Sequence, residues 1–179
     1  IDLQGEPLLL RFADHPDLWA RRIGPCHARV MTISAPSPER YGSVWAFDPF
    51  SAEGDDPRAY AANSMLEGAT AVGFAVDGAR LEPEAMARLE AFAEAHGGAV
   101  YTASGPQYVL FHPDEGDRIE AGFVKVAVPD DPGVLGRLHA LLGELARGAS
   151  PLVWPELREA VGDAAGAAAD RDTAERWGM

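Results

Sequence analysis

The residues best suited to nucleophilic catalysis are an adjacent cysteine and histidine, Cys26 and His27. A thiol nucleophile needs a base within hydrogen-bonding reach of its sulfur. Because adjacent side chains of an extended chain point to opposite faces, we expect His27 to be badly placed for this task. A remote base such as His112 or His139 stays open, since such pairs meet only in the folded protein. We therefore assign no catalytic residue and interpret Cys26 as a buried or incidental cysteine.

The five histidines form no pattern typical of a metal site. None is paired as H-x-H or H-x-x-x-H, and one cysteine is too few for a zinc set of cysteines and histidines. The serines lack the G-x-S-x-G context of a nucleophile elbow, and no glycine-rich phosphate loop is present. We predict neither a metal site nor a cofactor.

The longest polar loop, residues 48–58, combines acidic side chains with one aromatic ring. A calcium loop of the EF-hand type needs oxygen ligands at alternate positions, but Pro49 and Ala52 occupy such places. We expect either a solvated loop or a recognition patch for a basic partner. The residues of this predicted patch are Phe50, Glu53, Asp55 and Asp56.

The charge balance of the chain restricts its partners. There are 28 acidic residues against 15 lysines and arginines, which gives a formal net charge of −13 over 179 residues. Such a surface repels phosphate backbones and anionic membranes, so we expect no nucleic-acid or membrane partner. The single lysine, Lys125, beside abundant arginine, alanine and glycine is typical of a GC-rich bacterial genome.

The sequence favours a cytoplasmic location. No apolar run approaches the length of a membrane-spanning helix. The first residues lack the basic and apolar regions of a signal peptide, and Cys26 has no second cysteine for an internal disulfide.

The hydrophobic pattern predicts an α+β fold, a mainly antiparallel sheet with helices packed on one face. Strands are expected over 8–12, 27–34, 42–47, 70–76, 99–103, 107–112 and 118–128, and helices over 15–23, 59–67, 82–96, 131–147 and 151–161. Ser104–Pro106 suggests a hairpin turn, and a change of alternation at Gly122 suggests a bulge. We expect one domain over residues 1–150 and a C-terminal helical, alanine-rich appendage over 151–179, with little order in 163–172.

Residues 124–148 resemble two known strand-to-helix junctions. One is the first step of ACT-type amino-acid-binding domains, and the other is the acetyl-CoA loop of N-acetyltransferases. Pro132 and Leu135 stand where the acetyltransferase motif needs its glycines, and the chain turns helical where an ACT domain needs further strands. We interpret the segment as a junction capped by Asp131.

The second expected helix, 131–147, carries small residues beside its leucine stripe. Interior glycine costs about 1 kcal/mol relative to alanine, so its presence suggests close approach by another backbone. Gly136, Ala140 and Gly143 are therefore a predicted helix–helix interface, with a homodimer as one possibility.

Two classes of function fit these patterns. The first is a small acidic, non-catalytic binding protein that captures a basic protein or peptide, as immunity proteins, antitoxins and adaptors do. The second is an enzyme with a dispersed site, a hydrolase or transferase using histidine with a carboxylate or Cys26. We favour the first class because catalytic motifs are missing.

Overall fold

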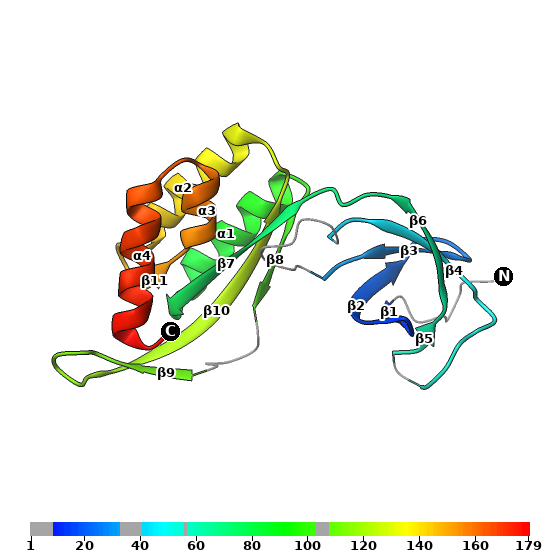
Figure 1. Cartoon of the computed structure of the whole chain (residues 1–179), viewed down its shortest axis with the longest axis horizontal. Coiled ribbons are helices and arrows are strands. Elements are labelled where there is room, and N and C mark those ends of the chain that lie inside the picture. The colour runs from blue at the N-terminus through cyan, green and yellow to red at the C-terminus, as the bar shows by residue number, and fades with distance from the viewer. Residues whose placement is uncertain (1–8, 33–40, 56, 103–107) are drawn as a thin grey trace. The chain divides into compact units, whose positions relative to one another are not determined.

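A computed structural model describes residues 9–32, 41–55, 57–102 and 108–179. The chain forms two compact units, Ile1–Val72 and Gly73–Met179. Each unit has its own mostly antiparallel sheet, and the mixed content confirms the predicted α+β class (Figure 1). The composition predicts a different division, with one domain over residues 1–150 and an appendage over 151–179.

The first unit is a small barrel. Its strands are β1 (Leu9–Phe12), β2 (His15–Arg22), β3 (His27–Val30), β4 (Val44–Phe47), β5 (Ala59–Tyr60) and β6 (Ala62–Glu67). They lie in the order β5-β1-β2-β3-β4-β6. One residue, Ala61, separates β5 from β6, so a single segment pairs with both β1 and β4 and brings the two edges of the sheet together.

The interior of this barrel is packed by alternate residues of its strands. The buried cluster consists of Leu10, Phe12, Leu18, Ala20, Ala28, Val30, Phe47 and Tyr60. Phe47 lies in this core as expected, while Trp45 packs against it only partly buried. A cation also points inward, since Arg22 is 7% exposed.

Two predicted helices of this unit, 15–23 and 59–67, are wrong. The first segment is β2, in which Leu18, Ala20 and Arg22 are buried with a period of two. An arginine at a core position conceals this period in the sequence. The second segment is β5 and β6, and the residues of β6 are mostly exposed. Backbone pairing with β4, rather than a hydrophobic pattern, holds β6 in place.

The second unit has a sheet covered by helices. Its elements are β7 (Val72–Ala79), α1 (Pro83–Ala95), β8 (Ala99–Thr102), β9 (Tyr108–Phe111), β10 (Arg118–Val128), α2 (Pro132–Leu145), β11 (Leu152–Val153), α3 (Pro155–Ala160) and α4 (Ala164–Trp177). The strand order is β11-β7-β10-β8, with β9 also paired to β10. In Figure 1 the helices of this unit gather on one side of the sheet.

The expected hairpin between β8 and β9 is wrong, because both strands pair antiparallel with β10 and therefore run in the same direction. Its predicted turn, Ser104–Pro106, lies outside the described residues. The change of alternation at Gly122 coincides with a change of partner: Ala121 pairs with Tyr108, and Val124 pairs with Thr102.

The two strongest helix predictions are confirmed. Helix α1 begins at Pro83, and α2 begins after Asp131, whose carboxylate accepts a hydrogen bond from the Val134 amide at 3.0 Å. Arg88 of α1 reaches Glu144 of α2 at 2.7 Å, which links the two helices.

The C-terminal segment is part of the second unit. Strand β11 replaces the beginning of the expected helix 151–161 and pairs with β7. Gly78 permits this pairing, because its φ of 130° suits glycine and a side chain there would collide with the Pro151 carbonyl. Residues 164–177 form the regular helix α4, so the expected lack of order in 163–172 is wrong.

Candidate functional site

The acidic loop after β4 is an ordered turn that exposes one aromatic side chain. The Phe50 amide donates to the Asp48 carboxylate at 2.9 Å, and the Ser51 hydroxyl donates to the Asp48 carbonyl at 2.7 Å. Glu53 pairs with Ala59 through two backbone hydrogen bonds of 2.9 Å. The Phe50 side chain, held by this turn, is 89% exposed.

The predicted patch residues Glu53 and Asp55 are exposed in the same loop as Phe50. Asp56 lies outside the described residues. An aromatic ring beside exposed carboxylates combines an apolar anchor with a negative charge, a composition suited to a basic partner with an apolar group.

The small residues of α2 face open space. Gly136, Ala140 and Gly143 are exposed, and a side chain built at either glycine would meet no atom within 4 Å. No described backbone of this chain approaches the two glycines closely, and the helix–helix interface stays a prediction.

Cys26 and His27 lie closer than alternation predicts. The Cys26 sulfur is 4.0 Å from Nε2 of His27, so the expectation that their side chains point apart is wrong. Cys26 lies in the turn before β3, where the strand rule for opposite faces does not apply. The alternative bases, His112 and His139, belong to the other unit.

Arg22 fixes the turn that carries Cys26. Its guanidinium donates to the Pro25 carbonyl at 2.9 Å and to the Tyr60 hydroxyl at 3.0 Å. The same group stacks over Phe47 and Tyr60, with its carbon 4.9 and 5.3 Å from the ring centroids. The Arg22 Nε is buried and has no hydrogen-bond partner among the described residues.

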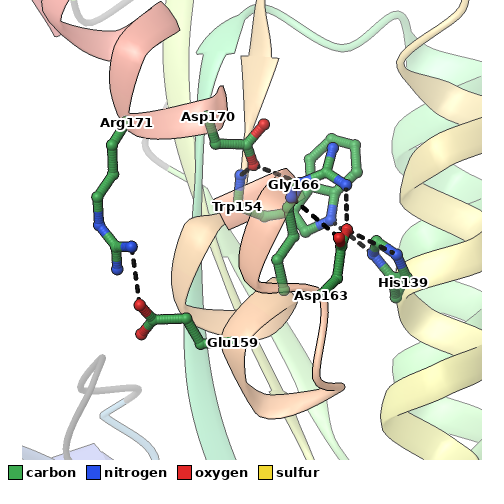
Figure 2. A network of polar contacts seen from close by, with 8 residues as sticks. His139, Trp154, Glu159, Asp163, Gly166, Asp170 and Arg171 are labelled. Carbon is green, nitrogen blue, oxygen red and sulfur yellow. Dashed lines mark hydrogen bonds and ion pairs between the residues drawn. The ribbon is translucent and has the colours of Figure 1, made fainter. Parts of the chain in front are cut away.

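A polar network joins the three C-terminal helices of the second unit, α2, α3 and α4 (Figure 2). The Asp170 carboxylate accepts hydrogen bonds from the Trp154 amide at 2.9 Å and from Nε of Arg158 at 2.6 Å. The Asp163 carboxylate accepts from Arg158 at 3.0 Å and from the Gly166 amide at 2.9 Å. These last two bonds hold the pKa of Asp163 below its ordinary value, with the Gly166 amide as the larger cause.

His139 belongs to this network as a structural residue. Its Nδ1 accepts a hydrogen bond from the Trp154 indole at 3.0 Å, which leaves the proton on Nε2, 3.7 Å from Asp163. Figure 2 shows the His139 ring beside Asp163. The network therefore brings a histidine and a carboxylate together, the pair of groups named for the second class of function.

Two further histidines hold local backbone structure, His112 in a turn and His96 at the end of α1. His112 Nδ1 accepts from the backbone amides of Asp114 and Glu115 at 3.1 and 3.0 Å, and its ring meets the Trp177 ring edge-on. This arrangement agrees with the turn role predicted for His112. His96 ends α1, where its Nδ1 lies 2.8 Å from the Phe92 carbonyl.

A carboxyl group on β7 is destabilised in its charged form. Burial raises the pKa of Asp77, the nearby Glu156 carboxylate adds to the rise, and Lys125 opposes it. Burial likewise raises the pKa of Tyr108, with the Asp77 charge as the next cause.

A cleft of about 800 Å³ lies between the beginning of α1, the chain after α2, and the sheet. Its apolar lining includes Val76, Leu81, Met86 and Val124, and its polar rim includes Arg80, Glu82, Thr102, Glu120 and Ser150. None of the predicted site residues lines this cleft.

The described part of the chain contains no group of three or more histidine, cysteine or acidic residues able to hold a metal ion, and none of its described helices is long and apolar enough to cross a membrane. Arg22, Arg158 and Asp170 make the polar contacts described above, and none of them was predicted as a site residue. The sequence does carry a signal for their neighbour Asp163, because an aspartate three residues before Gly166 is typical of a helix start. No family model, curated protein or solved structure matches this chain.

Proposed function

We propose that this protein is a non-catalytic binding protein that captures a basic protein or peptide through the loop at residues 48–56. The observation that carries the proposal is the Phe50 side chain, 89% exposed on a hydrogen-bonded turn and flanked by the exposed Glu53 and Asp55. An exposed aromatic ring that can fill an apolar pocket of a partner is typical of an interface hot spot.

The net charge supports the same conclusion. A formal charge of −13 accelerates encounters with a basic partner, and the acceleration falls as salt screens the charges. The carboxylates then govern the association rate, while Phe50 governs the dissociation rate by filling an apolar pocket of the partner.

The test uses a synthetic peptide in which arginine pairs alternate with leucine, and an otherwise identical peptide with glutamine in place of arginine. Wild-type protein is expected to bind the arginine peptide more tightly. Phe50→Ala should weaken binding about tenfold or more, mostly through faster dissociation. Asp55→Lys combined with Asp56→Lys should slow association several-fold and flatten its salt dependence.

Phe111→Ala is the matched control for Phe50→Ala, since Phe111 is an aromatic residue of the other unit that is 58% exposed. The control should bind like the wild type. Equal binding of both peptides, or equal effects of the two alanine variants, would remove the loop from the binding site.

The second class, an enzyme with a dispersed site, is favoured by one observation, the 4.0 Å contact between Cys26 and His27. If Cys26 is a nucleophile, His27→Ala should slow its alkylation by iodoacetamide at neutral pH several-fold. We expect no such change, and we expect Cys26→Ser to bind the arginine peptide as the wild type does.

A further inference from the structure

The outer side of β1, β2 and β3 carries a group of arginines between apolar side chains. Strand pairing places Leu9 opposite Arg21 and Arg21 opposite Arg29 in one row across the sheet. In the next row Arg11 lies opposite Trp19, whose carbonyl accepts from the Met31 amide. We call this surface the arginine face; its residues are Leu9, Arg11, Trp19, Arg21, Arg29 and Met31.

The apolar members of the arginine face are open to solvent. Leu9 is 49% exposed, Trp19 is 43% exposed and Met31 is 43% exposed. The Arg11 guanidinium carbon lies 5.8 Å from the centre of the Trp19 ring. Tryptophan and arginine side by side are the residue types most enriched at the centres of protein interfaces.

The charges of the face are not balanced by the described residues. Within that part of the chain, no ion pair joins Arg11, Arg21 or Arg29 to a carboxylate. Asp17, on the same side of β2 beyond Trp19, is the acidic residue nearest along that strand. The Arg11 Nε is buried and has no hydrogen-bond partner among the described residues.

Arg21 and Arg29 are direct cross-strand partners. Like charges opposite each other on one face of an antiparallel pair oppose folding. Folding alone therefore does not account for this pair. A carboxylate placed between the two guanidinium groups would remove the repulsion and accept charge-assisted hydrogen bonds from both.

We propose that the arginine face is a second binding surface, specific for an acidic protein segment that carries apolar side chains between its carboxylates. The carboxylates pair with Arg21 and Arg29, and the apolar side chains cover Leu9, Trp19 and Met31. The face adjoins the acidic loop, because Ala59 pairs with both Arg11 and Glu53. With the loop binding a basic partner as proposed above, on which this step rests, the protein holds a basic and an acidic segment at neighbouring surfaces.

The composition of the surface favours a protein segment over a nucleic acid. A nucleic acid is a polyanion that the net charge of −13 repels at long range, and phosphate contacts do not need the exposed leucine and methionine. A short acidic segment has fewer charges to be repelled and can bury those apolar side chains.

The test is an NMR titration of the full-length protein with a synthetic peptide in which glutamate pairs alternate with leucine. Chemical shifts of the Trp19 indole and of the Arg21 and Arg29 amides are expected to move together with a single saturable affinity. Arg21→Glu combined with Arg29→Glu should weaken binding at least tenfold. The matched control, Arg118→Glu combined with Arg147→Glu, changes the net charge equally at exposed arginines of the other unit that have no ion pair among the described residues, and should bind like the wild type.

The neutral variant Arg21→Gln tests the proposal independently through two measurements, the melting temperature and peptide binding. Arg21→Gln should raise the melting temperature, because it removes the like-charge pair, and should weaken peptide binding. A fall in both would indicate a structural role for Arg21 and overturn the proposal.

Three further results would also overturn it. The first is equal binding of the two charge-reversed double variants. The second is tighter binding of a thymidine oligonucleotide than of the acidic peptide. The third is self-association of the free protein in sedimentation velocity that Arg21→Glu with Arg29→Glu abolishes, since the occupant would then be a second copy. The glutamate peptide reports on this surface and the arginine peptide on the loop, so the two proposals fail separately.

Discussion

At the scale of single residues, the two units stabilise an arginine side chain in different ways, and that arginine is buried in the first unit and partly exposed in the second. Arg22 has carbonyl, hydroxyl and aromatic partners, while Arg158 lies between the carboxylates of Asp163 and Asp170 and over the Trp154 ring. Removal of a carboxylate should therefore have its largest effect in the second unit, where a charge would be left without its partner.

Asp170→Asn is expected to destabilise the protein by about 1–3 kcal/mol, the usual effect of leaving a buried hydrogen-bonding group without its partner. Asp170 is 6% exposed and serves both Arg158 and the Trp154 amide, so its loss leaves two donors poorly matched. Urea unfolding followed by tryptophan fluorescence measures the change. Asp172→Asn, at an exposed position of the same helix, is the control and should differ little from the wild type.

Asp77→Asn is expected to stabilise the protein at neutral pH. Burial raises the pKa of Asp77 in the folded state, so the folded protein binds this proton more readily than the unfolded chain. The resulting stability is fully present below the unfolded pKa of about 3.9 and is lost as pH rises through the higher folded pKa. Asparagine has no charged form, so burial at this position does not destabilise the variant at neutral pH.

Melting temperatures across this pH range check the prediction for Asp77. The advantage of the asparagine variant should be absent under acidic conditions and should grow toward neutral pH. An advantage that is the same at every pH would show that packing, not charge, distinguishes the two side chains.

At the scale of elements, α4 is the most informative, because its composition predicts little order while the structure shows a regular helix. Residues 163–172 are alanine, glycine, aspartate and arginine, with no large apolar side chain. The helix is nevertheless anchored: Ala167 is 1% exposed, Asp170 reaches Arg158, and the Trp177 ring meets His112.

Deletion of residues 163–179 should therefore lower the melting temperature by more than about 5 °C, which corresponds to about 1 kcal/mol or more for a domain of this size. The physical reason is that Arg158 loses both carboxylates and Trp154 loses the acceptor of its amide. Calorimetry measures the shift. A melting temperature within about 2 °C of the wild type would mean that the tail contributes as little as its composition suggests.

Trp177→Ala separates the two anchors of α4. This change removes the ring contact with His112 but keeps the carboxylates. A smaller loss than in the deletion is expected, since the buried ion pairs remain.

At the scale of the whole molecule, the division into two compact units has a thermodynamic consequence. Each unit has its own sheet and its own buried residues, so unfolding need not be a single two-state transition. We expect residues 73–179 expressed alone to keep their fold, because the network around Arg158 and the core under α1 and α2 lie within that unit.

Near-ultraviolet circular dichroism checks this expectation, since Trp154 is 2% exposed and held by two hydrogen bonds. The isolated unit should retain the tryptophan signal and unfold cooperatively. Loss of that signal would show that the second unit depends on the first.

The sequence by itself determined the features that rest on local patterns. Charge counting established the net charge, and apolar periodicity with Asp131 and Pro83 at helix starts located α1 and α2. The α+β class followed from the same patterns. These features depend on residues close together in the chain, whose contributions can be read without knowing the fold.

Only the tertiary structure decided which distant residues meet. Strand β2 escaped prediction because Arg22 occupies a core position, where Phe47, Tyr60 and the Pro25 carbonyl contact its guanidinium. The partners of Arg158, and the row that places Arg21 beside Arg29, depend on helix packing and strand register. A one-residue change of register would move every side chain of a strand to the other face, so no local pattern specifies such a surface.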